Sequence, residues 1–182
     1  MAVSTNPPDD TSPPEDTTDR DFVITRTLSA PRSLVFEAWT NTKYLSQWWG
    51  PRPFTTPVCQ LDLRVGGALR IVMRSVDGVD YPITGVFIEI ERPERLVMTF
   101  DAAEHPAEWH DMVKPDRLQG DDNPAGIMLQ FVTFEDLGDK TNLTIRTRFD
   151  TVAIRDAMLK MGMTEGWSQS LDRLDELVAR MT

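Results

Sequence analysis

Residues 163–178 have the sequence MTEGWSQSLDRLDELV, the pattern of a long amphipathic helix near the end of the chain. Thr164 is placed to cap this helix through its side-chain oxygen. One face carries an apolar stripe at helical spacing, made of Trp167, Leu171, Leu174 and Val178. Charged residues occupy mostly the other faces. A helix with one apolar stripe must cover that stripe with another element, and the rest of the chain has to supply it.

The segments upstream of this helix are typical of strands in an antiparallel sheet. Apolar or alternating runs occur at residues 22–28, 58–63, 69–74, 81–90, 96–100, 127–134 and 143–149. Most successive runs are separated by short turn sequences such as Gly66-Gly67 and Asp77-Gly78, which favour antiparallel neighbours. The sequence therefore predicts an α+β fold. A curved antiparallel sheet of about seven strands would wrap its concave face around the C-terminal helix.

Two short helices are expected after the first strand. Pro31 suits the first turn of a helix, where its missing N–H costs nothing. An apolar stripe follows at Leu34, Val35, Ala38 and Trp39. A second helix is predicted from about Thr42 to Trp48, because Gly50-Pro51 stops it. Together these elements predict a single domain at residues 21–182.

Two segments show neither the strand pattern nor the helix pattern. Residues 1–20 carry two Pro-Pro pairs and several acidic residues and have almost nothing to bury, so they are predicted to be a disordered acidic tail. Residues 102–125 contain three prolines and are longer than an ordinary hairpin loop. An insert of this kind is either functional or poorly ordered. Whether it is an ordered lid stays open at this point.

Charge and hydropathy exclude several classes of partner. The formal net charge of −10 argues against nucleic acid and anionic membranes, because phosphate contacts need clustered Lys and Arg. No apolar run approaches the length of a bilayer span, and the N-terminus has no signal-peptide pattern. Cys59 is the only cysteine, so no intrachain disulfide can form. These features predict a cytoplasmic protein.

Five segments, in order, resemble a known family. They are ITRTLSAPRSLVFEAWT at 24–40, QWWGP at 47–51, DLRVGG at 62–67, GVFIEIERPERLVMTF at 85–100 and MGMTEGWSQSLDRLDELV at 161–178. The chain resembles the START-like SRPBCC superfamily. Within it, the chain is most similar to the branch of the C-terminal domain of the activator of the ninety-kilodalton heat-shock protein ATPase. The resemblance implies a helix-grip fold with a cavity under the C-terminal helix, but it implies no particular reaction.

Aromatic and methionine side chains near the expected cavity are the candidate ligand-binding residues. Aromatic rings suit a flat or apolar ligand, and methionine adapts to irregular shapes. Trp109 is a candidate because a large apolar side chain among charged residues is expected to be buried, and it could close the cavity. The candidate set is Trp48, Trp49, Met73, Phe87, Met98, Trp109, Met163, Trp167 and Leu171.

Two charged residues interrupt apolar strand patterns. Arg26 falls among Phe22, Ile24 and Leu28, and Glu89 shares a predicted face with Phe87. If these faces point inward, both charges would be desolvated and would need partners. A buried carboxylate with a raised pKa can act as a general acid or base, so Glu89 and Arg26 are the only catalytic candidates. Structural ion pairs are the alternative.

His105 and His110 lie in the insert beside three carboxylates, a composition that divalent metals favour. The segment HPAEWH does not have an established ligand spacing, however, so no metal site is predicted. No cofactor is expected either, because the chain lacks a P-loop and a dinucleotide fingerprint.

Three functions remain open from the sequence. The first is binding of a small hydrophobic or aromatic ligand in the cavity, which the lack of catalytic motifs favours over enzyme activity. The second is a co-chaperone-like interaction domain that contacts a chaperone. The third is a cyclase, dehydratase or hydrolase that uses the same cavity. Homodimer formation is not decided by the sequence.

Overall fold

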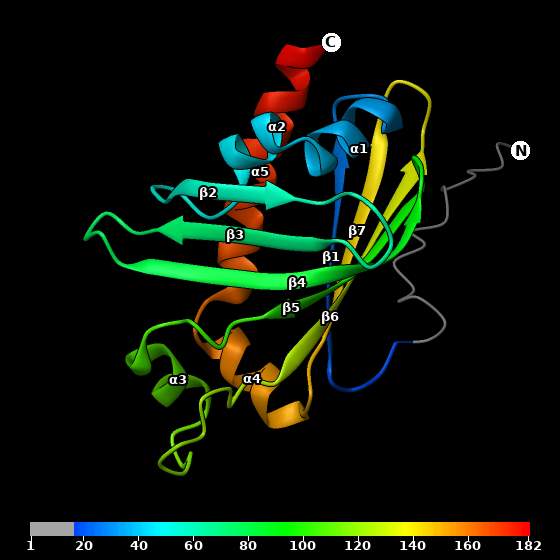
Figure 1. The fold of residues 1–182 in the computed structure, drawn as a ribbon. Coiled ribbons are helices and arrows are strands. Elements are labelled where there is room, and N and C mark those ends of the chain that lie inside the picture. The colour runs from blue at the N-terminus through cyan, green and yellow to red at the C-terminus, as the bar shows by residue number, and fades with distance from the viewer. Residues whose placement is uncertain (1–16) are drawn as a thin grey trace, which may run out of the picture.

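Seven antiparallel strands form one sheet in the order β1-β7-β6-β5-β4-β3-β2 in the computed structural model, which describes residues 17–182 (Figure 1). The strands are β1 (Asp21–Leu28), β2 (Thr55–Leu61), β3 (Ala68–Arg74), β4 (Asp80–Glu91), β5 (Arg95–Asp101), β6 (Ile127–Asp136) and β7 (Thr141–Arg148). Only β1 lies out of sequence order in the sheet, where it pairs with β7 at one edge. The predicted α+β fold with an antiparallel sheet of about seven strands is confirmed.

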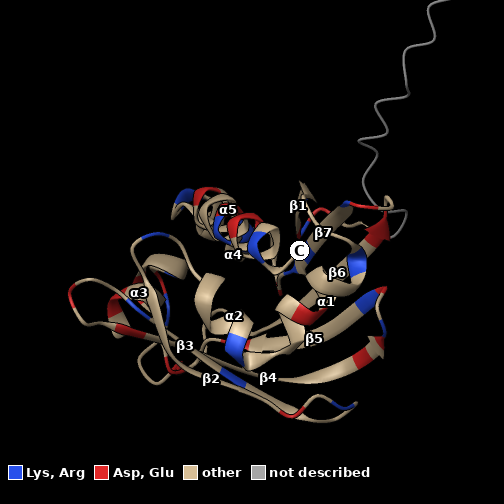
Figure 2. Cartoon of the chain, turned by 90° about the horizontal axis from the view of Figure 1, so that it is seen from above, with Lys and Arg blue, Asp and Glu red and all other residues tan. Residues whose placement is uncertain are grey.

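Five helices accompany the sheet in the described part of the chain. They are α1 (Arg32–Thr40), α2 (Thr42–Trp48), α3 (Ala107–Val113), α4 (Val152–Lys160) and α5 (Met163–Met181). Figure 2 shows α5 lying across the open side of the curved sheet, with α3 at one end. The long helix contacts α1, α2 and β1. The sheet thus wraps around the C-terminal helix as a helix-grip fold requires.

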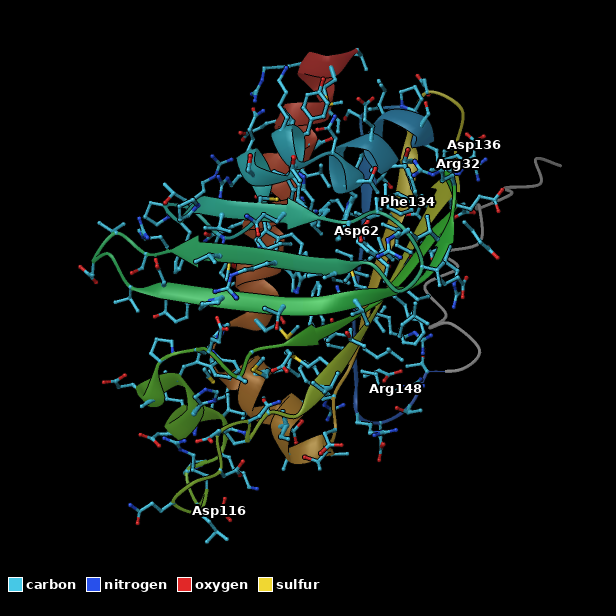
Figure 3. The ribbon with its side chains drawn as sticks, in the orientation of Figure 1. Arg32, Asp62, Asp116, Phe134, Asp136 and Arg148 are labelled. Carbon is cyan, nitrogen blue, oxygen red and sulfur yellow. The ribbon has the colours of Figure 1, made fainter. Side chains whose placement is uncertain are left out.

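One end of the concave face is filled by aromatic side chains from α1 and α2. The Trp39 ring lies 4.9 Å from Trp48 and 6.2 Å from Phe134, measured between ring centroids. Trp48 is fully buried, and its indole Nε1 donates to the Ala38 carbonyl oxygen at 2.9 Å. Figure 3 shows Phe134 at this end of the sheet. Tight packing here leaves no room for a ligand between these helices and the sheet.

The structure adds detail at the two ends of the predicted domain. Residues 1–16 lie outside the described residues. Arg20, predicted to belong to the tail, donates from Nη1 to the carbonyl oxygens of Phe149 and Asp150, so this residue contacts the end of β7 and the residues that follow it. The C-terminal helix begins at Met163 after Gly162, whose φ of 92° favours glycine, and not at a Thr164 cap.

Helices α3 and α4 were not predicted from the sequence. Thr151 caps α4, because its Oγ1 accepts a hydrogen bond from the Ile154 backbone N–H at 3.2 Å. α3 lies within the 102–125 insert and contacts α4, so the insert has a defined place at one end of the fold. None of the helices in residues 17–182 is both long enough and apolar enough to span a bilayer.

Candidate ligand-binding cavity

A cavity of about 420 Å³ lies between the sheet and α5, at the end of the fold away from the tryptophans of α1 and α2. Its volume falls within the range of small-molecule sites, which is about 300–1,000 Å³. The cavity is partly open to solvent, and α3, α4 and the α2–β2 loop border it. It is therefore the place where the fold could hold a ligand.

Five neighbouring strands supply the floor of the cavity. Side chains on one face of an antiparallel sheet come from alternate residues of each strand, so each strand contributes only one or two. These side chains are Met73 of β3, Tyr81 and Ile83 of β4, Phe100 of β5, Met128 and Gln130 of β6, and Thr147 of β7. The floor is mostly apolar, with a hydroxyl or amide group on Tyr81, Gln130 and Thr147.

The first turns of α5 form the opposite wall. Met163, Gly166, Trp167 and Ser170 line the cavity, and their spacing of three and four residues places them on one helix face. The Trp167 ring stacks on Trp39, with centroids 6.3 Å apart and planes inclined by 17°. Gly166 leaves open space at this wall. A Cβ added at this position would meet no heavy atom within 4 Å, apart from its chain neighbours and the backbone of its own helix.

Arg173 fastens α5 to the α2–β2 loop beside the cavity. Its Nη1 donates to the carbonyl oxygens of Gly50 at 2.7 Å and Phe54 at 3.3 Å. Its Nη2 donates to the carbonyl oxygen of Gln47 at 2.9 Å. The same loop contributes four lining residues, which are Trp49, Gly50, Pro51 and Phe54. The guanidinium group therefore holds two walls of the cavity together.

Replacing Arg173 with methionine is expected to lower the free energy of unfolding by about 2 kcal/mol, because hydrogen bonds from a charged group to partly buried backbone carbonyls are lost. Urea denaturation measures this change. Arg180→Met is the matched control, since Arg180 lies exposed in the last turn of the same helix. An equal loss in both variants would contradict the role assigned to Arg173.

His105 and Trp109 close the cavity on the side of the insert. The His105 ring lies 4.4 Å from Trp109 and 5.4 Å from Tyr81, between centroids. Burial lowers the pKa of His105 to about 4, although a hydrogen bond to the Pro82 backbone acts in the opposite direction. His105 is therefore a neutral ring at pH 7, and it presents no charge to a ligand.

The lining carries very little charge. Among the described residues that line the cavity there is no Lys, Arg, Asp or Glu. Gln130 is fully buried and Thr147 is 1% exposed, and the Thr147 hydroxyl donates to Gln130 Oε1 at 2.6 Å. A cavity of this kind suits a mostly apolar, uncharged molecule, because a charged group would lose its hydration without gaining a counter-charge.

Comparison with known proteins places this fold and cavity in a family. The family described as Activator of Hsp90 ATPase homolog 1-like protein matches residues 29–179, which is most of the chain. The chain belongs to this family. The match confirms the START-like resemblance drawn from the five sequence segments. No curated protein matches the chain.

Several solved structures share the fold. A protein of Nitrosomonas europaea is 26% identical, with a TM-score of 0.74, and the alignment covers 91% of this chain and 97% of that one. An Arthrobacter aurescens protein is 24% identical over 91% of this chain and 90% of its own, with a TM-score of 0.71. The AHSA1 protein of Silicibacter pomeroyi is 22% identical over 89% and 99%, with a TM-score of 0.66.

Five of the nine candidate binding residues line the cavity. They are Trp49, Met73, Trp109, Met163 and Trp167. They come from the α2–β2 connection, β3, α3 and α5, which the fold brings together from distant parts of the sequence. Sequence reasoning found Trp167 from helical periodicity, and it found Met163 because a methionine cluster precedes the last helix. It found Trp109 because a large apolar ring stood among charged neighbours.

The other four candidates lie outside this cavity. Phe87 and Met98 face a void of about 10 Å³ under α1 and α2, where Trp39 and Leu45 fill the space above the sheet. Trp48 and Leu171 are fully buried. All four are buried core residues, and the short helices α1 and α2 cover the part of the sheet where Phe87 and Met98 lie.

Sequence reasoning did not assign Tyr81, His105, Gln130 and Thr147 to a ligand site, although all four line the cavity. Gln130 and Thr147 had a usable signal, since each is a polar residue inside a run of alternating strand residues. Their pairing across β6 and β7 depends on strand register, which the sequence alone did not supply.

Arg26 and Glu89 are not among the residues that line the cavity, and their catalytic roles stay predictions. Arg26 forms an ion pair with Asp172 of α5 at 2.5 Å. Glu89 pairs with Arg95 at 2.9 Å. A register shift between Phe87 and Glu89 inserts an extra residue into β4, and Glu89 therefore does not share the face of Phe87. Each of the two charges therefore has an oppositely charged partner.

The histidines of the insert are not arranged as metal ligands. Within residues 17–182 no three His, Cys, Asp or Glu side chains are grouped so that they could hold an ion. Glu104 instead pairs with Arg70 at 2.7 Å, and His110 Nε2 lies 3.1 Å from the Ala103 carbonyl oxygen.

Proposed function

We propose that the domain binds one small, mostly apolar or aromatic molecule in the cavity between the sheet and α5. The observation that supports this most strongly is the cavity itself, which has a volume of about 420 Å³ and a lining rich in aromatic and methionine side chains. Methionine tolerates ligands of different shape, and aromatic faces favour flat rings. Binding would bury apolar surface of the ligand that water otherwise covers.

The neutral dye phenylnaphthylamine tests this proposal directly. The dye is expected to bind with saturable, one-to-one stoichiometry, to gain fluorescence, and to quench Trp167 through energy transfer. A ligand at a hundred times its Kd should raise the free energy of unfolding by about 2.7 kcal/mol. Failure of this dye and of other apolar probes to change either tryptophan fluorescence or the melting temperature would contradict the proposal.

Native mass spectrometry of protein purified gently from its own host addresses the natural ligand. We expect an adduct mass that disappears in the denatured spectrum, since the cavity holds its ligand without a covalent bond. The mass of the released molecule then defines its chemical class.

A second candidate function rests on the family match across residues 29–179. The family description names activation of the Hsp90 ATPase, so the domain would contact a chaperone through its outer surface. The net charge of −10 would favour a basic patch on that partner. Recovery of purified Hsp90 in a pulldown at low salt supports this function. No recovery at low salt, together with dye binding, supports the cavity function alone.

A further inference from the structure

Gln130 of β6 and Thr147 of β7 form a buried polar pair in the wall of an otherwise apolar cavity. The two residues are opposite one another in the strand register, and both line the cavity. The Thr147 hydroxyl donates to Gln130 Oε1 at 2.6 Å. Gln130 is 0% exposed and Thr147 is 1% exposed, so water does not solvate them as it does surface side chains.

The pair leaves one hydrogen-bond donor without a partner. Gln130 Nε2 is buried and has no hydrogen-bond partner among the described residues. If the amide were rotated by half a turn, one N–H of Nε2 would donate to the Thr147 oxygen, and the threonine O–H would be left without an acceptor while Gln130 Oε1 took the unpaired position. The pair therefore presents a free N–H or O–H donor in both amide orientations.

An unpaired buried donor is costly, since it loses water without gaining a partner. Nothing in the core packing requires an amide at this position, because the neighbouring floor residues are Met128, Phe100 and Ile83. A ligand oxygen placed against the pair would satisfy the donor. Buried polar groups inside apolar pockets commonly fix ligand orientation in this way.

We propose that Gln130 and Thr147 anchor a ligand oxygen, so that the ligand is an uncharged apolar or aromatic molecule with one acceptor such as a carbonyl. This inference rests on the proposed cavity function and names its substrate class. The acceptor belongs to a neutral group, because the described lining contains no Lys or Arg to pair with a carboxylate. His105, a further buried polar side chain in the wall, is neutral as well.

Three matched probes test the anchor. Methyl naphthyl ketone carries the acceptor. Its isopropenyl analogue replaces the carbonyl oxygen with a CH₂ group of the same shape, and naphthoate, substituted at the same ring position, carries a negative charge. Isothermal titration calorimetry at neutral pH compares their Kd values for the wild-type protein and for Gln130→Leu/Thr147→Val. This double variant removes both polar partners and keeps the side-chain shapes close.

The wild-type protein is expected to prefer the ketone over the isopropenyl analogue by roughly tenfold, as one satisfied hydrogen bond provides. Naphthoate should bind roughly a hundredfold more weakly than the ketone, since its charge is not compensated. In the double variant the ketone preference should fall to about one, while the isopropenyl analogue keeps its affinity. The melting temperature of the ligand-free variant should not fall, because no unpaired donor remains.

The outcomes separate this inference from the cavity function. Equal ketone preference in the wild-type and variant proteins would overturn the anchor, although binding of both neutral probes would still support the cavity. Tighter binding of naphthoate than of the ketone would overturn the assignment of a neutral ligand. Failure of all three probes would overturn both proposals. Should the double variant not fold, Gln130→Met/Thr147→Val removes the same polar pair and places a flexible apolar side chain at position 130.

Discussion

Replacing Gly166 with phenylalanine is expected to abolish binding of apolar molecules while the protein stays folded. Gly166 lies in α5 and lines the cavity, and a Cβ at this position meets no heavy atom within 4 Å. A benzyl group there would extend into the space that the ligand needs. The Kd for phenylnaphthylamine should rise by roughly a hundredfold or more, since the ring takes the place of the ligand contacts.

The variant should not lose stability. Glycine inside a helix is less favourable than alanine by roughly 0.5–1 kcal/mol, so a side chain at this position favours the helical state. Filling an apolar cavity adds dispersion contacts. A fluorescence titration with phenylnaphthylamine measures binding, and thermal unfolding of the ligand-free protein measures stability.

Gly166→Ala is the matched control for this variant. Its single methyl group should keep dye binding within a few-fold of the wild-type value and raise the free energy of unfolding by about 0.5–1 kcal/mol. A folded Gly166→Phe protein that binds the dye as tightly as the control would show that the dye occupies another site.

Acid is expected to destabilise the protein through His105, by about 3 kcal/mol at about pH 4. Burial lowers the pKa of His105 from 6.5 to about 4 in the folded state. As the pH falls below the unfolded-state pKa, the unfolded chain binds a proton that the folded protein excludes. The free energy of unfolding therefore decreases from about pH 6.5 downward and levels off below about pH 4.

Urea denaturation between about pH 7 and pH 4 measures this loss in the wild-type protein and in His105→Phe. The phenylalanine ring keeps the contacts with Trp109 and Tyr81 but binds no proton, so the pH dependence should be smaller by about 3 kcal/mol over this range. An unchanged pH dependence in the variant would contradict the role of His105.

Asp21 provides a separate acid response that does not overlap this range. Burial alone would raise its pKa, but hydrogen bonds from Arg148, Thr18 and Arg146 outweigh that effect and lower the pKa to about 2. Its stabilising contribution is present above about pH 4 and is lost only as the pH falls toward 2. The two groups can therefore be told apart by the pH at which stability changes.

Local sequence patterns predicted the elements well where their periodicity was long and regular. Alternating apolar residues identified the strands, and the stripe from Trp167 to Val178 identified α5. Shorter elements had weaker signals. α3 has only seven residues, and it follows Pro106, which is also typical of a loop. The bulge in β4 changes the face of Glu89, but nothing in the sequence marks its position.

The sequence by itself determined the sheet, the long helix and the family, because side-chain periodicity and ordered motifs are local properties of the chain. Only the tertiary structure decided where the cavity lies. The concave face is mostly apolar, but α1 and α2 fill one half of it, and Phe87 and Met98 became core residues there. Strand register and helix placement bring together residues that lie far apart in the chain. Periodicity shows which face of an element a side chain occupies, but it does not show what covers that face. The register between β6 and β7 set Gln130 beside Thr147 and left a polar donor in an apolar wall.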